Sequence, residues 1–188
     1  MEIDHALVIG GTGMLRRGTV AIAERSRRLT AVSRTTASLA ALARLLADRD
    51  GDRYETLDWD QPEQFVLGLQ RLVNQVEHPT LVLAWLHDMN LGPRVAEVIS
   101  SPRTVCDFFQ VLGSGGGSPQ GGATALRAQV EALSDVRYFQ VVLGFKRESG
   151  ASRWLTDDEI SDGVLEAIRK REAQHIVGTL DPWDQRPQ

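Results

Sequence analysis

The sequence contains a single cysteine, Cys106, and only two tyrosines and two lysines among its 188 residues. One cysteine excludes an intramolecular disulfide and a cysteine-rich metal site, and its place in an apolar run predicts a buried, inert thiol. The longest purely apolar run, residues 81–86, is far too short to span a membrane. The acids Glu2 and Asp4 at the N-terminus match no signal-peptide pattern. These absences predict a soluble, cytoplasmic protein.

The sequence also has no excess of basic residues, because acidic residues outnumber them and the formal net charge is −4. This balance argues against a general binder of nucleic acid or of anionic membranes. Three of the arginines near the N-terminus, Arg25, Arg27 and Arg28, are expected at the end of the first helix, where cations suit the dipole. The sequence has no P-loop, nucleophile elbow or zinc signature, and its four histidines lack metal-ligand spacing. No metal site is expected.

Stretches that suit strands alternate with stretches that suit helices along the chain. This alternation predicts an α/β fold, a doubly wound parallel sheet of about seven strands with helices on both faces and the order 3-2-1-4-5-6-7. One domain is expected over residues 1–188, with a short tail from about residue 181. The expected strands cover residues 6–9, 28–33, 53–58, 80–86, 103–112, 136–145 and 174–180. The expected helices cover residues 14–25, 37–48, 62–76, 90–99 and 123–133, with a last helix headed by a capping box at 156–159. A surface loop is expected at the glycine-rich residues 113–122.

The first expected strand runs directly into a glycine turn, and a helix follows the turn. In a dinucleotide-binding βαβ unit, such glycines let the backbone approach a diphosphate, and the helix N-terminus offers free N–H groups. The turn therefore predicts a Rossmann fold that binds a dinucleotide. The residues expected to contact the cofactor here are Gly10, Gly11, Thr12, Gly13, Met14, Leu15 and Arg16.

One position departs from the glycine pattern, because Arg16 stands where the third glycine is usual. An arginine there either displaces the helix slightly from the sheet or points its side chain towards the ligand, and we favour the second. The alternative is an exposed helical arginine without a role.

The end of the second strand distinguishes between the two nicotinamide cofactors. NAD-binding proteins carry an acid about 20 residues past the turn, but here Ser33 and Arg34 follow the strand. Arg34 offers a 2′-phosphate a planar set of donors, so NADP (NADPH) is favoured over NAD. The alternative is that Ser33 caps the next helix and Arg34 is simply solvated.

These motifs together resemble the short-chain dehydrogenase/reductase superfamily, in an atypical and truncated form. The resemblance covers about residues 5–145 and rests on Val8-Ile-Gly-Gly-Thr-Gly-Met14, Val32-Ser-Arg34, Leu57-Asp58 and Val111-Leu-Gly-Ser114. The run from Arg153-Trp-Leu-Thr156 to Gly163, with Asp181-Pro-Trp183, is similar to bacterial proteins described as short-chain dehydrogenases. The resemblance implies that Asp58 contacts the adenine, although Asp58 also suits a plain turn at the strand end. It also implies a homodimer or homotetramer.

The resemblance further implies a catalytic Tyr and Lys four residues apart on the helix after the fifth strand, and a Ser just before that helix. The expected helix 123–133 contains neither Tyr nor Lys. Ser114 matches the serine, and His87 ends the fourth strand near the same edge and could supply a proton. Trp85 should lie close to the cofactor. The alternative for His87 is a polar loop residue without a catalytic role.

Two functions therefore stay open from the sequence. The first is an NADP-dependent oxidoreductase that passes a hydride between the nicotinamide and a small carbonyl or alcohol, with Ser114 and His87 around the substrate. The second is a catalytically silent NADP(H) sensor that acts through a partner surface, which the missing Tyr and Lys favour. A third and weaker possibility is a Rossmann scaffold that binds no nucleotide.

Overall fold

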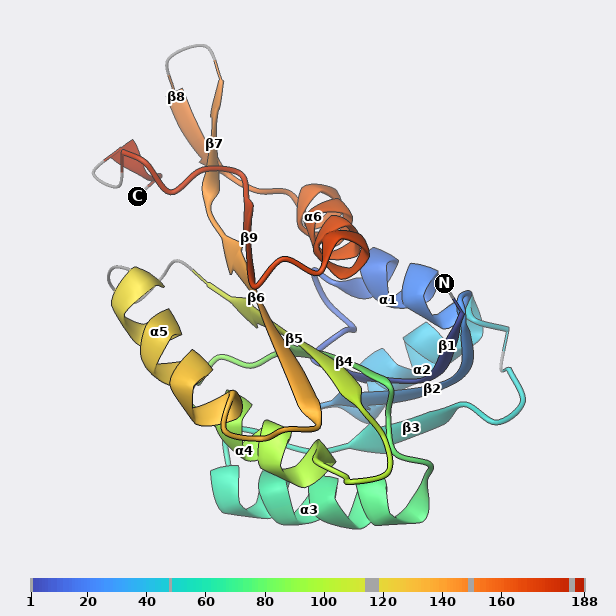
Figure 1. The fold of residues 1–188 in the computed structure, drawn as a ribbon. Helices are drawn as coiled ribbons and strands as arrows, with labels where there is room; N and C mark the ends of the chain where they lie inside the picture. The colour runs from blue at the N-terminus through green and yellow to red at the C-terminus, as the bar shows by residue number, and fades with distance from the viewer. Residues whose placement is uncertain (1, 48, 114–118, 149–150, 183–184, 188) are drawn as a thin grey trace.

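The computed structural model describes residues 2–47, 49–113, 119–148, 151–182 and 185–187. Seven parallel strands form one sheet in the order β3-β2-β1-β4-β5-β6-β9 (Figure 1). The strands are β1 (Ile3–Ile9), β2 (Ser26–Ser33), β3 (Arg53–Thr56), β4 (Leu81–Trp85), β5 (Cys106–Leu112), β6 (Val136–Leu143) and β9 (Gln174–Val177). Because β9 is the seventh strand of this sheet, the predicted α/β class and strand order are confirmed.

Helices cover both faces of the sheet, three on each (Figure 1). One layer holds α1 (Arg16–Ala23), α2 (Thr36–Leu45) and α6 (Asp157–Lys170), and the other holds α3 (Pro62–Gln75), α4 (Leu91–Ile99) and α5 (Pro119–Val130). Side chains of successive strand residues point to opposite faces. In β1, Ala6 and Val8 accordingly pack in the core under α1 and α6, while Leu7 and Ile9 pack under α3 and α4. Both faces of β1 are thus buried, which explains its unbroken apolar run.

The C-terminal third contains a hairpin that the sequence did not predict. The sixth strand was expected to run to residue 145, but it ends at Leu143, and β7 (Phe145–Glu148) and β8 (Ala151–Trp154) form a separate antiparallel pair. Gly144 separates the two, because a Cβ there would lie 2.1 Å from the carbonyl oxygen of Thr179. The backbone passes too close to the end of β9 for any other residue. The hairpin extends away from the sheet (Figure 1).

Three local expectations were wrong. The glycine-rich loop was expected to reach residue 122, but α5 begins at Pro119, a residue that suits a first helical position. The first helix was expected from residue 14 to 25, but it starts at Arg16 after the turn and ends at Ala23. Arg27 and Arg28 therefore belong to β2, where both pair with Glu77, rather than to the helix end.

Cys106 is buried within β5, and burial raises the pKa of its thiol, as expected for an inert cysteine. In the described part of the chain, no helix combines the length and the apolar character that crossing a bilayer requires.

Candidate functional site

The turn between β1 and α1 is built so tightly that two of its glycines cannot be replaced without strain. Gly10 has a φ of +76°, and its N–H donates to the carbonyl oxygen of Val32 at 3.0 Å. A Cβ at Gly10 would lie 2.3 Å from the carbonyl oxygen of Trp85. A Cβ at Gly11 would lie 2.4 Å from both the Thr19 hydroxyl and a methyl group of Val8. The turn is therefore fitted between β2, β4 and α1.

The start of α1 leaves its positive end available to a ligand. The capping residue Leu15 provides no side-chain hydrogen bond, and the first turn of the helix contains no acid. The open N–H groups and the partial positive charge of such a helix end attract anions. Gly13 lies just before this end, and a Cβ placed on it would meet nothing within 4 Å. The corner next to Gly13 is thus open, unlike the packed corners at Gly10 and Gly11.

A pocket of about 320 Å³ opens at this corner, within the usual size range of small-molecule sites. We call it the turn pocket. It is lined by Gly10, Thr12, Gly13, Met14, Ser33, Arg34, Thr35, Ser38, Trp59, Trp85 and His87. Eight of the predicted site residues are in this lining, so the structure brings together the glycine turn, the end of β2 and the end of β4.

The other predicted site residues lie elsewhere. Gly11 and Leu15 are buried beneath the turn, and Arg16 is exposed on α1. Because Gly11 packs directly against Thr19 of α1, the arginine at position 16 does not push the helix off the sheet. Asp58 is exposed on the loop after β3, outside the lining. Ser114 lies outside the described residues.

Hydroxyl groups line the side of the turn pocket that faces β2. Thr12 and Ser33 are hydrogen-bonded through their hydroxyls at 3.0 Å, and Ser33 and Ser38 at 2.9 Å. Thr35 is the capping residue of α2 and accepts a hydrogen bond from the Ser38 backbone. Neither Thr35 nor Ser38 was predicted as a pocket residue, because their positions in the lining depend on how α2 packs.

Arg34 extends over Trp59, a residue that no sequence pattern indicated. The guanidinium carbon lies 5.1 Å from the ring centre, and Nη1 donates to Asp60 Oδ2 at 2.6 Å. Trp59 is buried, and its indole N–H has no hydrogen-bond partner among the described residues. A buried donor without a partner carries an energetic cost that a ligand acceptor could relieve. Trp59 and Arg34 both contribute to the lining of the turn pocket.

At the opposite end of the turn pocket, Trp85 and His87 face each other. Their rings meet edge to face, with centroids 6.0 Å apart. Trp85 also covers the end of β5, since a Cβ on Gly113 would lie 3.0 Å from its indole ring. His87 is exposed and reaches the pocket from the loop after β4. An aromatic wall and an imidazole that can exchange protons therefore mark this end.

Neither the tyrosines nor the lysines line the turn pocket. Tyr138 is buried in β6 and donates to Gln110 at 2.6 Å, and burial raises the pKa of its phenol to about 12. Tyr54 belongs to β3. Lys146 pairs with Glu159 at 2.6 Å, and Lys170 pairs with Glu166 at 3.0 Å. Each of these four side chains therefore lies outside the lining of the turn pocket.

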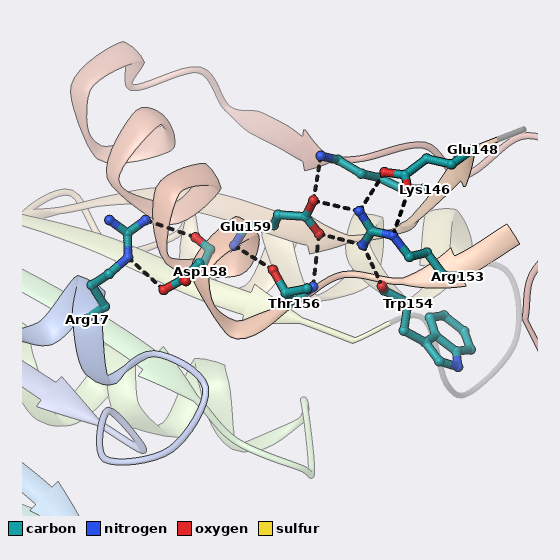
Figure 2. A network of polar contacts seen from close by, with 8 residues as sticks. All are labelled: Arg17, Lys146, Glu148, Arg153, Trp154, Thr156, Asp158 and Glu159. Carbon is teal, nitrogen blue, oxygen red and sulfur yellow. Dashed lines mark hydrogen bonds and ion pairs between the residues drawn. The ribbon is translucent and has the colours of Figure 1, made fainter.

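The glycine turn is supported from the far end of the chain by α6. The Ser161 hydroxyl donates to the Met14 carbonyl oxygen at 3.2 Å. Arg17 pairs with Asp158 at 3.1 Å (Figure 2), and it also pairs with Asp162. Gly18 packs against Ser161, since a Cβ on it would be 3.6 Å from the serine Cβ. No local sequence signal indicates this contact.

The head of α6 is joined in turn to the hairpin through Glu159. Its carboxylate accepts from the Thr156 backbone in the predicted capping box, and it pairs with Arg153 and Lys146 (Figure 2). These hydrogen bonds, the one from Arg153 above all, hold the pKa of Glu159 well below its usual range. The carboxylate therefore stays charged, and the β7–β8 hairpin stays tied to α6 and so to the glycine turn.

No protein-family model matches the chain, and no curated protein is similar to it in sequence. Solved structures are similar in fold. A short-chain dehydrogenase from Sphingobium yanoikuyae in complex with NADPH has 16% identity and a TM-score of 0.70 over 96% of this chain and 91% of that one. The MalC reductase/Diels–Alderase from Malbranchea aurantiaca has 13% identity and a TM-score of 0.72 over 94% and 96%. An alcohol dehydrogenase from the archaeon Thermococcus sibiricus, complexed with 5-hydroxy-NADP, has 18% identity and a TM-score of 0.68 over 98% and 99%. The chain thus has the fold of the short-chain dehydrogenases and reductases.

Proposed function

We propose that this chain binds NADP(H) in the turn pocket and transfers a hydride between the nicotinamide and a small carbonyl or alcohol. The observation that carries the proposal is the open corner at Gly13, directly before the uncapped N-terminus of α1. A diphosphate fits such a corner, because backbone N–H groups and the helix dipole offset its charge. Two solved proteins of similar fold are complexes with NADPH and with 5-hydroxy-NADP, which supports the choice of cofactor class.

The residues of the turn pocket fit the adenosine half of the cofactor. In this proposal the turn from Gly10 to Gly13 holds the diphosphate, with Arg16 available beside it. Ser33 and Arg34 receive the phosphorylated ribose, and Trp59 provides an apolar surface. The guanidinium that lies over this ring has the planar set of N–H donors that suits a phosphate.

At the other end, bound NADPH supplies the hydride and the chain supplies the proton. His87 holds a proton on its imidazole and gives it to the carbonyl oxygen as the alcohol forms. The sequence predicts a second role at the same oxygen for Ser114, that of orienting it for the reaction. Trp85 shields this end from water, since its ring lies across Gly113. The carbonyl carbon gains the hydride and the oxygen gains the proton, so the reduction is balanced.

A second candidate function is a silent NADP(H) sensor that binds the cofactor without turning it over. The positions of Tyr138, Lys146 and Lys170, each bonded away from the turn pocket, favour this candidate. A cytoplasmic location and a homodimer or homotetramer stay predictions under both candidates.

Arg34→Ala is expected to weaken NADPH binding and leave NADH binding within twofold. Charge-assisted hydrogen bonds contribute about 1.5–3 kcal/mol each, so the dissociation constant for NADPH should rise about tenfold to hundredfold. Quenching of tryptophan fluorescence during titration with each cofactor measures both constants, because Trp59 and Trp85 line the turn pocket.

Arg94→Ala is the matched control, since Arg94 forms a comparable exposed ion pair with Glu63 at 2.8 Å away from the turn pocket. An Arg34→Ala variant that binds NADPH as tightly as the unaltered chain would contradict the assignment of NADP. If Arg34→Ala weakened the binding of NADPH and of NADH equally, that result would also contradict the assignment of NADP.

Oxidation of NADPH by a panel of aldehydes, ketones and quinones separates the enzyme from the sensor. We expect turnover, followed at the NADPH absorbance, and we expect His87→Ala to lower kcat about hundredfold, the lower end of the usual contribution of a general acid. Ser114→Ala should also lower kcat. NADPH binding without turnover across the whole panel would contradict the enzyme and support the sensor.

A further inference from the structure

Arg34, the proposed phosphate-binding residue, already has an anionic partner within the chain. Its Nη1 lies 2.6 Å from Asp60 Oδ2, with the two side chains 40% and 57% exposed. Arg34 lines the turn pocket, whereas Asp60 lies outside the lining. The carboxylate therefore holds the guanidinium from the rim of the pocket, where both groups are accessible to an incoming ligand.

The backbone that carries this carboxylate is held in place by its own loop. The backbone N–H of Asp60 donates to Asp58 Oδ1 at 3.0 Å, and the N–H of Gln61 donates to the Asp58 carbonyl oxygen at 3.2 Å. These bonds form a tight turn just before Pro62 begins α3. On its other side the guanidinium lies over Trp59. Both members of the pair are thus restrained before any ligand arrives.

This arrangement makes Asp60 a competitor of a phosphate group. A 2′-phosphate needs the donors of Arg34, one of which Asp60 occupies, and the two anions repel each other at such short range. A free ribose hydroxyl meets no repulsion, and a carboxylate can accept a hydrogen bond from it. Asp60 therefore opposes the 2′-phosphate and tolerates the hydroxyl.

We propose that Asp60 is a specificity-determining residue that reduces the preference of the turn pocket for 2′-phosphorylated over unphosphorylated dinucleotides. This inference rests on the proposed function, because it needs an adenosine bound beside Arg34. In the unaltered chain the preference for NADPH over NADH is then smaller than Arg34 alone would produce, and removal of the Asp60 charge restores it.

Calorimetric titration with two probes, adenosine 2′,5′-bisphosphate and 5′-AMP, isolates the contribution of the 2′-phosphate. Asp60→Asn keeps the size of the side chain and removes its charge, so we expect it to bind the bisphosphate about tenfold more tightly and 5′-AMP within twofold. Glu63→Gln is the control, because it removes one carboxylate charge from an arginine pair three residues further along. It should leave both constants unchanged. In an Arg34→Ala background, Asp60→Asn should have less than a threefold effect.

The outcomes separate the inference from the proposed function. Where the unaltered chain binds NADPH or NADH, an Asp60→Asn variant with an unchanged or weaker preference for the bisphosphate overturns the inference alone. A chain that binds neither dinucleotide overturns the proposed function, and the inference with it. Asp60→Ser provides a second uncharged variant with the same expected change in preference, and thermal unfolding checks that each variant is folded.

Discussion

Gly10→Ala is expected to lower the free energy of unfolding by about 3 kcal/mol, from the cost of a left-handed backbone and of overpacking together. The φ of +76° disfavours any residue with a Cβ, and that Cβ would overlap the Trp85 carbonyl oxygen at 2.3 Å. The obstacle is backbone at the end of the central strand β4, so it cannot rotate away as a flexible side chain could. Urea denaturation followed by circular dichroism measures the loss.

Gly18→Ala is the control for this change. Gly18 lies inside α1, and its added Cβ would make an ordinary contact with Ser161 at 3.6 Å. Glycine within a helix is less favourable than alanine by about 0.5–1 kcal/mol, so Gly18→Ala should be neutral or slightly stabilising. A Gly10→Ala variant as stable as the unaltered chain would show that the turn does not pack against β4 as described.

Gly13→Asp is expected to abolish NADPH binding, with a dissociation constant at least about a hundredfold higher and an unchanged melting temperature. The fold should tolerate the change, because a Cβ at Gly13 meets nothing within 4 Å. The new carboxylate would stand where we propose the diphosphate binds, and bringing like charges together costs several kcal/mol. Fluorescence titration and differential scanning calorimetry give the two quantities.

Gly13→Asn separates the charge from the size of the new side chain. It is expected to weaken NADPH binding much less than Gly13→Asp, since only steric hindrance remains. If Gly13→Asp bound NADPH normally while folded, the diphosphate could not lie at this corner, and the proposed function would fail.

Local patterns were enough to predict the strand order and the open corner of the turn. The glycine cluster after an apolar run identifies β1 and the start of α1, because both signals occur within a dozen residues. Positions at the carboxyl ends of parallel strands meet at one edge of the sheet. For this reason Ser33, Arg34, Trp85 and His87 could be assigned to one pocket from the sequence alone.

Features that depend on contacts between distant segments could not be predicted. Trp59 and Asp60 follow a short strand in a loop whose path is set by Asp58 and by the packing of α3. The hairpin was merged with β6 because Gly144 interrupts the strand only through its contact with Thr179. The contact of Asp58 with the adenine stays a prediction, and its carboxylate accepts a hydrogen bond from the Asp60 backbone in the turn that carries Asp60.

The bond from Ser161 to Met14 has a consequence for biosynthesis, since it joins residues 147 positions apart. At 5–20 residues per second, the glycine turn leaves the ribosome about 7 to 30 s before the helix that supports it. A nascent chain therefore carries the nucleotide signature long before it carries the finished corner. Until Ser161 has been synthesised, the carbonyl oxygen of Met14 lacks the hydrogen bond that α6 supplies.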